Sequence, residues 1–168
     1  MSEVTVRPET PDDIESVVTI LETVGAEKRW IGTEVPFDRA ARAAEMRRAL
    51  DDPETFAAFV ADAAGAGVIG SIGLTLAPYG VVEFGMAILD GYRGEGIGPR
   101  LLECGIEWAR RVGAHKMALQ VWPHNERAIA LYRKVGFVEE GRLQRHYRRR
   151  DGEIWDALIM GLHLDQTP

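Results

Sequence analysis

The sequence predicts an α/β fold, in which a mixed, mostly antiparallel sheet of about seven strands carries helices on both faces. Two features of the chain indicate this fold. Three strand patterns follow one another in the middle of the chain with only short turns between them, which favours antiparallel pairing. Strands and helices alternate further on, as in a parallel crossover. The expected order is β-α-α-β-β-β-α-β-α-β-β, in a single domain over residues 4–165.

The chain opens with a strand and a helix. Val4–Arg7 alternates apolar and polar residues and stops before Pro8, which is typical of a strand end. Asp12 or Asp13 can cap a helix that runs to about Val24 with its apolar residues on one face.

The middle of the chain predicts one helix and three strands. The helix is rich in Ala, Arg and Glu, which are good helix formers. Glycine turns separate apolar runs that are short enough to be strands. In order, we expect an irregular stretch over Gly25–Pro36, a helix over Asp38–Leu50, strands over Phe56–Ala61 and Val68–Leu76 joined by the turn at Gly65–Gly67, and a strand over Val81–Leu89.

The last third predicts two helices and three strands. The first helix carries an apolar stripe at helical spacing, and the final two strands flank an Asp-Gly pair, which is a strong hairpin signal. We expect helices over Gly98–Val112 and Glu126–Val135, and strands over Lys116–Trp122, Phe137–Arg149 and Glu153–Leu164, with the hairpin turn at Asp151-Gly152.

Composition excludes several classes of protein. The 168 residues are 46% hydrophobic and 27% charged, as in an ordinary globular protein. No stretch approaches the ~18 apolar residues of a membrane span, and the first ten residues have no apolar run, so we expect neither a membrane anchor nor a signal peptide. Cys104 is the only cysteine and cannot form an internal disulfide, which favours the reducing cytoplasm. The net charge of −6 argues against nucleic acid as a partner and is compatible with a cationic substrate such as an amine.

A glycine-rich segment precedes the helix that begins near residue 98. It reads Arg93-Gly94-Glu95-Gly96-Ile97-Gly98. Glycines allow the backbone to approach a ligand closely, and the helix N-terminus adds free N–H groups and partial positive charge. Arg93 adds a forked cationic donor. The segment therefore predicts a pyrophosphate cradle, although a glycine turn with no ligand is the alternative.

Two common phosphate-binding motifs do not fit this segment. A P-loop needs Gly-Lys-Ser/Thr, which is absent from the sequence. A Rossmann fingerprint counted from Gly94 and Gly96 would need a third glycine where Pro99 stands. Arg93, Gly96 and Gly98 instead resemble the R/Q-x-x-G-x-G/A signature of GNAT (GCN5-related) acetyltransferases.

A second segment strengthens this resemblance. In members of the family, a strand is followed by Asn and then by the pattern Ala-x-x-Leu-Tyr-x-Lys-x-Gly-Phe. This chain matches the pattern with Asn125, Ala128, Leu131, Tyr132, Lys134, Gly136 and Phe137. The start of the chain and its end, from Gly141 to Met160, are similar to the bacterial branch with ribosomal-protein alanine, polyamine and amino-acid acetyltransferases. The resemblance covers nearly the whole chain.

The resemblance implies a site for acetyl-CoA, used as a co-substrate with no metal. The pantetheine arm would pair with the strand backbone of Met86, Ala87 and Ile88. The pyrophosphate would lie on the amides of Arg93, Gly94, Glu95, Gly96, Ile97 and Gly98. Asn125 would reach the coenzyme, cap the helix that follows, or do both.

The resemblance also implies acetyl transfer to a primary amine by direct attack in a ternary complex. Glu83 is the candidate base, because a glutamate inside an apolar strand is unusual unless it is paired or functional; the alternative is an exposed or ion-paired strand residue. The amide near Ile88 is the candidate oxyanion donor. Tyr132 would give a proton to the coenzyme sulfur, and its alternative is a packing aromatic residue.

The acceptor is less well defined by the sequence. Trp30, Glu34 and Phe37 lie where the family forms the acceptor wall, and they either contact the amine or simply pack. A small-molecule amine or amino acid is slightly favoured over a protein N-terminus or lysine. The alternative from another class is a non-catalytic acyl-CoA-binding sensor.

Two further features have mainly structural interpretations. Arg142, Arg145, His146, Arg148, Arg149 and Arg150 form a basic run, which we interpret as a solvated strand face rather than a contact for an acidic partner or for the coenzyme 3′-phosphate. The four histidines lack metal-ligand spacing. A symmetric homodimer is compatible with the sequence because such dimers are common.

Overall fold

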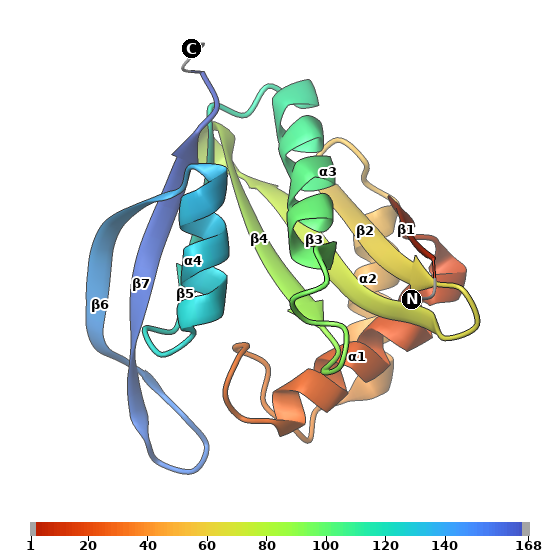
Figure 1. Ribbon diagram of the computed structural model, residues 1–168, viewed down its shortest axis with the longest axis horizontal. Coiled ribbons are helices and arrows are strands. Elements are labelled where there is room, and N and C mark those ends of the chain that lie inside the picture. The colour runs from red at the N-terminus through yellow and green to blue at the C-terminus, as the bar shows by residue number, and fades with distance from the viewer. Residues whose placement is uncertain (1–2, 166–168) are drawn as a thin grey trace.

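A computed structural model of the protein describes residues 3–165. Seven strands form one sheet in the order β1-β2-β3-β4-β5-β7-β6 (Figure 1). Only the β4–β5 pair is parallel, and the other neighbours are antiparallel. The strands are β1 (Val4–Pro8), β2 (Phe56–Ala63), β3 (Gly67–Ala77), β4 (Val81–Ile88), β5 (Lys116–Val121), β6 (Val138–Arg148) and β7 (Ile154–His163).

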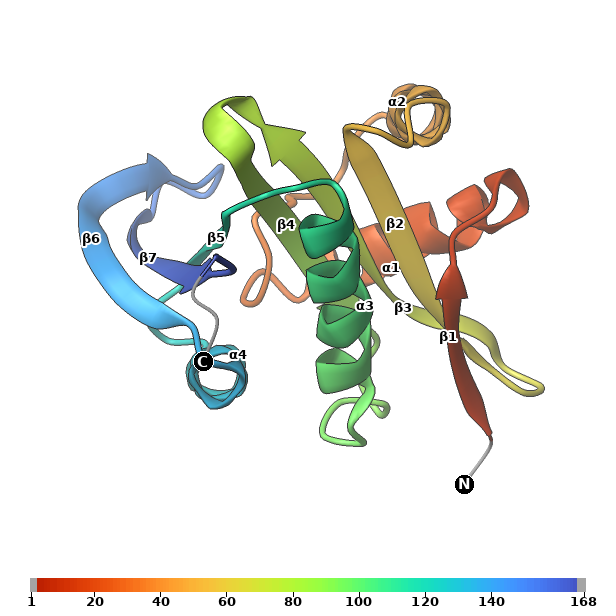
Figure 2. The same ribbon diagram turned by 90° about the horizontal axis from the view of Figure 1, so that it is seen from above.

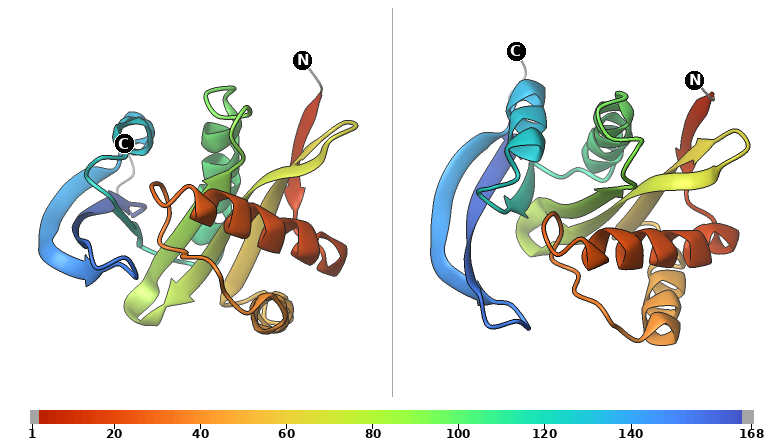
Figure 3. Two further views of the ribbon diagram at one scale, coloured as in Figure 1. Left: turned by 90° about the horizontal axis from the view of Figure 1, so that it is seen from below. Right: turned by 60° about the horizontal axis from the view of Figure 1, so that its bottom comes forward.

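Helices cover both faces of the sheet, as the sequence predicts. Figure 3 shows α1 and α2 on one face and α3 and α4 on the other. The helices are α1 (Ile14–Ala26), α2 (Arg39–Leu50), α3 (Ile97–Arg111) and α4 (Glu126–Val135). The predicted order of elements is confirmed, with ends that differ by one to two residues in most cases. None of the helices in residues 3–165 is long and apolar enough to cross a membrane.

The main core lies between the sheet and the α3–α4 face. The apolar stripe of α3 enters it, with Leu101 and Leu102 fully buried and Trp108 only 3% exposed. Gly105 lets α3 approach the sheet closely, since a Cβ there would stand 2.8 Å from a Leu74 side-chain carbon. On the other face, α1 packs on the sheet through Ile20, and the same helix packs against α2, as seen from above in Figure 2.

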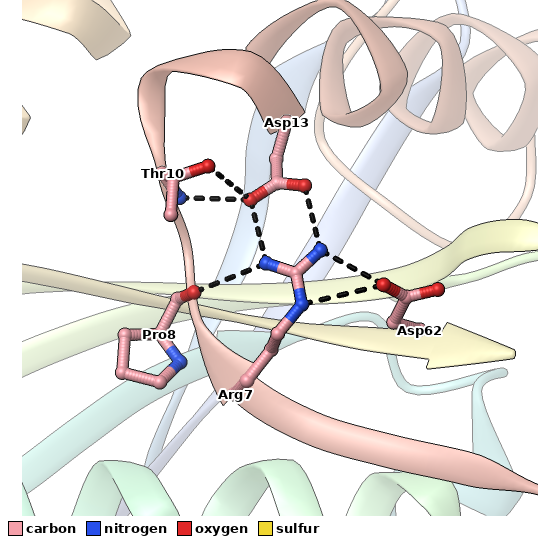
Figure 4. A network of polar contacts seen from close by, with 5 residues as sticks. All are labelled: Arg7, Pro8, Thr10, Asp13 and Asp62. Carbon is pink, nitrogen blue, oxygen red and sulfur yellow. Dashed lines mark hydrogen bonds and ion pairs between the residues drawn. The ribbon is translucent and has the colours of Figure 1, made fainter.

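The N-terminal strand is tied to α1 by a network of ion pairs (Figure 4). The Arg7 guanidinium donates to both carboxylate oxygens of Asp13 at 2.8 Å, and to Asp62 on β2 at 2.9 Å. Asp13 also accepts from the Thr10 backbone N–H at 2.8 Å. These bonds hold the pKa of Asp13 well below its usual range, mainly through Arg7. A short 3-10 turn (Pro11–Asp13) precedes α1, and Asp13, one of the two predicted caps, is the residue before the first residue of the helix.

Glu9 is a buried carboxyl next to this network. The side chain is 9% exposed, and its Oε1 has no hydrogen-bond partner among the described residues. Burial, with a smaller effect from the Asp13 charge, raises the Glu9 pKa from 4.5 to about 7. The folded chain therefore keeps a proton that the unfolded chain loses between these two pH values.

The contribution of Glu9 to the free energy of unfolding should consequently fall as pH rises from 4.5 through 7, because the ionised Glu9 is disfavoured only in the folded state. Asp13 affects stability at lower pH. Because its pKa is depressed in the folded state, its contribution to stability is lost only as pH falls below the ordinary pKa of an aspartate. We expect Glu9→Gln to raise the free energy of unfolding at pH 8 by on the order of 1 kcal/mol, with a smaller gain at pH 5. Urea unfolding at both pH values measures this. Glu3→Gln, at an exposed glutamate before β1, is the control, and an equal gain at both pH values for Glu9→Gln would contradict the expectation.

The β6–β7 hairpin forms one end of the sheet, and β6 is the outermost strand. Its pairing with β7 shifts register twice, between Glu139 and Gly141 and between Leu143 and Tyr147. Arg145 lies within the second irregularity with a φ of 51°. β6 is therefore bent and irregular over most of its length, whereas the sequence predicts an unbroken strand.

Candidate active site

Strands β4 and β5 separate after a short stretch of pairing. They pair only from Val81 to Glu83 on β4, although β4 continues to Ile88. On its other side β4 stays paired with β3 as far as Ile88. The β5-facing edge from Phe84 to Ile88 therefore has no strand partner among the described residues. Backbone groups in such a position need water or a ligand as partner.

The register shows which backbone groups face this edge. Leu89 donates its N–H to the Ile69 carbonyl, so the hydrogen-bonded pairs with β3 fall at residues 87 and 89. The N–H and C=O groups of Met86 and Ile88 therefore point away from β3, toward β5. Ala87 directs its own backbone groups to β3, so of the three predicted strand residues only Met86 and Ile88 offer hydrogen bonds at the free edge.

A cavity of about 1100 Å³ occupies the space between the two strands. This volume is large enough for a ligand the size of a cofactor. The cavity brings together most of the side chains and turn residues that the sequence predicts: Trp30, Glu34, Glu83, Met86, Ala87, Ile88, Arg93, Gly94, Gly96, Gly98, Asn125 and Tyr132.

Three predicted residues do not line the cavity. Ile97 is 2% exposed and packs in the main core, and Glu95 is exposed to solvent. Of the two interpretations of Phe37, contact with the amine or packing, the structure favours packing: its ring lies against the α1–α2 core, with the Arg42 guanidinium 5.3 Å from the ring centroid. Phe37 follows Pro36 and directly precedes the Asp38 cap of α2, which directs it to that helix pair.

The glycine turn has the geometry of a cradle. Gly91, Gly94 and Gly96 have φ values of 84°, 86° and 78°, which side chains rarely adopt. Gly96 is the N-cap of α3, and a Cβ at this position would meet no atom within 4 Å. Its surface is therefore open beside the free N–H groups of the first helical turn. Gly98 has a different reason to be glycine, since a Cβ there would stand 2.9 Å from Leu131 of α4.

The guanidinium of Arg93 binds protein groups outside the glycine turn. Its Nε donates to the Ile88 carbonyl at 2.8 Å, and its two Nη atoms donate to Glu27 at 2.9 and 2.6 Å. The ion pair lowers the pKa of Glu27. The expectation that the Arg93 side chain adds charge to a pyrophosphate is therefore not supported in this structure, although its backbone remains part of the turn.

Arg127 lies near the glycine turn and was not among the site residues predicted from the sequence. It lines the cavity, and its Nη1 lies 4.0 Å from where a Gly94 Cβ would stand. An arginine in the first turn of a helix is unfavourable to the helix dipole. That misplaced charge is the sequence signal that could have identified it.

Asn125 has a clear structural role. Its Oδ1 accepts from the Ala128 N–H at 3.3 Å and so caps α4. The residue also lines the cavity, so the cap and a ligand contact are compatible.

The two candidate catalytic residues approach the cavity from opposite faces of the sheet. Phe84 faces α4, where its ring lies 5.9 Å from that of Tyr132. Ala87 faces α1, where it belongs to a small core cluster. Glu83 shares its face with Ala87 because side chains alternate along a strand. The cavity between the splayed strands therefore joins a Glu83 side and a Tyr132 side.

Tyr132 is held in a protonated state by its surroundings. The residue is only 7% exposed, and burial raises its pKa to about 12. Its hydroxyl forms no hydrogen bond with any described residue, and it lines the cavity. It is therefore a free proton donor at any ordinary pH.

The α1–α2 loop (residues 27–38) contacts the β6–β7 hairpin beside the cavity, which Gly32, Glu34 and Arg149 help to line. Arg149 donates to the Gly32 carbonyl at 3.2 Å and lies 3.5 Å from the Glu34 carboxylate. Arg150 donates its backbone N–H to Glu34 at 3.0 Å and its Nη1 to the Pro36 carbonyl at 2.6 Å. Glu34 is thus bonded to the hairpin. Both arginines join the loop to the hairpin, and of the two only Arg149 is buried, while Arg150 stays exposed to solvent.

Arg149 is the most enclosed member of the basic run. It is 6% exposed, with its guanidinium 4.6 Å from the Trp155 ring centroid and 5.4 Å from that of Trp122. Arg142 instead pairs with Asp156 at the surface. Within residues 3–165, no group of three or more His, Cys, Asp or Glu side chains is placed to hold a metal ion.

Comparison with known proteins agrees with this geometry. Residues 20–137 match the sequence profile of the acetyltransferase (GNAT) family. The chain is 35% identical over 88 residues to an L-methionine sulfoximine/L-methionine sulfone acetyltransferase of Pseudomonas aeruginosa, covering 52% of this chain and 51% of that protein. It is 37% identical over 79 residues to the [ribosomal protein bS18]-alanine N-acetyltransferase of Escherichia coli, covering 47% and 53%. The matches span about half the length of these curated relatives.

The fold is also that of a solved protein with a bound coenzyme. The structure of yncA from Salmonella typhimurium, which contains acetyl-CoA, superposes with a TM-score of 0.86 at 22% identity, covering 99% of this chain and 97% of that one. At this identity the likeness concerns the fold alone. The family profile, in contrast, spans most of the chain, including both the glycine turn and the Tyr132 helix. The chain belongs to the GNAT acetyltransferase family.

Proposed function

We propose that this protein transfers the acetyl group of acetyl-CoA to the primary amine of a small molecule, by direct attack within a ternary complex. The observation that carries the proposal is the single cavity between β4 and β5, which joins the glycine turn, Tyr132 and Glu83. A reaction without a covalent enzyme intermediate needs both substrates in one space.

Acetyl-CoA fits the residues on the Tyr132 side. The free N–H and C=O groups of Met86 suit an amide of the pantetheine arm, whereas the Ile88 carbonyl is already bonded to Arg93. The open surface at Gly96, the α3 N-terminus and the Arg127 guanidinium suit a pyrophosphate. Asn125 is near enough to the cavity to add a polar contact.

Acetyl transfer would use a proton acceptor on the Glu83 side of the cavity and a proton donor on the Tyr132 side. The amine nitrogen attacks the thioester carbonyl carbon, the C–N bond forms and the C–S bond breaks. Glu83 takes the proton lost by the amine, directly or through water, and Tyr132 gives its proton to the departing sulfur. The Ile88 N–H faces the cavity and can donate to the developing oxyanion, since the Ile88 carbonyl is already bonded to Arg93.

A small acceptor is favoured over a protein. A peptide needs an open groove beyond the reacting amine, and the bonds of Arg149 and Arg150 to the α1–α2 loop narrow the space available there, which supports a smaller acceptor. The named relatives include enzymes for both kinds of acceptor. The sensor alternative is less favoured because Glu83 and Tyr132 both line the cavity. A cytoplasmic location and a homodimer stay predictions.

The direct test is acetyl-CoA titration calorimetry followed by detection of free thiol with a panel of amines. The panel contains L-methionine sulfone, a polyamine and a peptide with an N-terminal alanine. We expect binding of acetyl-CoA, and thiol release with a small amine but not with the peptide. Absence of binding would overturn the proposal, and turnover of the peptide alone would overturn its small-molecule part.

The base assignment gives its own expected result. Glu83→Gln should lower kcat by about 100-fold near pH 7, because the amine then has no positioned proton acceptor. The loss should shrink at high pH, where free amine becomes abundant. Initial rates from pH 6 to 10 with the best amine of the panel measure this. Glu126→Gln is the control, as a glutamate in the first turn of α4 that does not line the cavity. An unchanged kcat for Glu83→Gln would remove Glu83 from the mechanism.

A further inference from the structure

Glu27 is the first residue of the α1–α2 loop, and its carboxylate contacts Arg93 at the start of the glycine turn. We propose that Glu27 is a positioning residue that fixes the acceptor side of the cavity to the coenzyme side and withholds Arg93 from the coenzyme phosphates. The inference rests on the proposed function. Glu27 follows the last residue of α1, and its carboxylate accepts from both Nη atoms of Arg93, at 2.9 and 2.6 Å.

The same carboxylate organises the cavity wall. Trp30 donates its indole Nε1–H to Glu27 Oε2 at 2.6 Å. The Arg93 guanidinium lies 5.9 Å from the centroid of the Trp30 ring, on the border of a cation–π contact. Trp30 and Arg93 both line the cavity, whereas Glu27 does not. Glu27 therefore acts through these two side chains and not on a substrate.

Two other bonds hold the loop from the α4 side. The His124 Nε2–H donates to the Arg29 carbonyl at 2.7 Å, and Asn125 Nδ2 lies 3.5 Å from the Trp30 carbonyl. Both are bonds to neutral carbonyls. Of the contacts described here between the loop and the coenzyme side, the Glu27–Arg93 pair is the one that carries charge.

All three nitrogens of the Arg93 guanidinium already have a partner, and Asp90 Oδ1 lies a further 3.6 Å from Nη1. Its Nε is bonded to the Ile88 carbonyl and its Nη atoms to Glu27. A phosphate must therefore compete with Glu27 for the guanidinium. Removing the charge of Glu27 should release a cation beside the glycine turn, and at the same time loosen the Trp30 wall.

These two effects have opposite signs, which separates positioning from simple structural support. With coenzyme A as the probe, we expect Glu27→Gln to bind about threefold more tightly than the wild type at low salt, as for the loss of one competing surface ion pair. The advantage should fade as salt is raised. Amide hydrogen exchange of residues 27–38 without ligand should become about tenfold faster. A residue with only a structural role would loosen the loop and weaken coenzyme A binding.

Two further variants complete the test. Glu22→Gln removes another α1 glutamate that pairs with an arginine, Arg39, away from the cavity, and it should leave coenzyme A binding and loop exchange unchanged. In an Arg93→Met background, Glu27→Gln should no longer tighten coenzyme A binding, since the released cation is absent. Weaker coenzyme A binding by Glu27→Gln, or unchanged exchange of the loop, would overturn the inference while the proposed function stands. A wild type that binds no coenzyme A would overturn both.

Discussion

Replacement of Gly96 by glutamate should abolish coenzyme binding, with the dissociation constant of acetyl-CoA raised at least about 100-fold, equivalent to 2.7 kcal/mol or more. Gly96 begins α3 with a φ of 78°, and the space above it is open. A glutamate would place a bulky anion where the helix N-terminus otherwise attracts a phosphate. The unfavourable φ adds backbone strain, so stability must be measured alongside. Titration calorimetry with acetyl-CoA gives the binding constant.

Gly113→Glu is the matched control for the strain. Gly113 follows the other end of α3, has a φ of 77°, and likewise has no atom within 4 Å of a Cβ position. Both variants should lose similar thermal stability, while Gly113→Glu keeps wild-type affinity for acetyl-CoA. Tight acetyl-CoA binding by a folded Gly96→Glu protein would show that the glycine turn is not the pyrophosphate site.

Replacement of Tyr132 by phenylalanine should lower kcat by about 100-fold or more while the KM for acetyl-CoA stays within about twofold, as for loss of a general acid. The ring remains to pack on Phe84 and Phe137, so the fold should be kept. Because the Tyr132 pKa is raised to about 12, the hydroxyl stays protonated throughout the working range. The rate of the wild type should therefore show no decline from Tyr132 ionisation below about pH 10.

The control for this variant is Tyr92→Phe. Tyr92 packs beside the glycine turn and does not line the cavity, so its hydroxyl should be dispensable. Steady-state rates with a good amine acceptor, together with coenzyme A affinity, separate a loss of chemistry from a loss of binding. An unchanged kcat for Tyr132→Phe would transfer the role of proton donor to water.

The fold was largely predictable because local signals agree with it. The strand and helix periodicities, the Asp38 and Asn125 caps and the Asp151-Gly152 turn all specify their elements without help from distant residues. The 3-10 turn before α1 was not predicted, although its signals are local: Pro11 begins it and the Thr10 N–H donates to Asp13. The register shifts in β6 depend on tertiary contacts, such as the Arg145 N–H bonded to Asp156.

The parts of the site that depend on backbone conformation could be predicted from the sequence. The hydrogen-bond and ion-pair partners of its side chains were less predictable. The glycine turn and the capping asparagine follow from residue type and spacing. Arg93 carried the expected charge, but its partner Glu27 lies 66 residues away and could not be paired with it from the sequence. The same holds for Arg149, which contacts the loop carbonyl of Gly32 across 117 residues. Long-range contacts thus determine which arginine side chains remain available to bind a ligand.

The irregular course of β6 bears on whether the sheet can extend from one molecule into the next. An open sheet ends in unpaired backbone groups that can template aggregation. Here one outer strand changes register twice and carries Arg145 in a left-handed conformation. The other outer strand, β1, is only five residues long, and its Val4 carbonyl accepts from Arg100. Neither border offers a long, flat, regular ladder, so the sheet is poorly suited to continue from one molecule into the next.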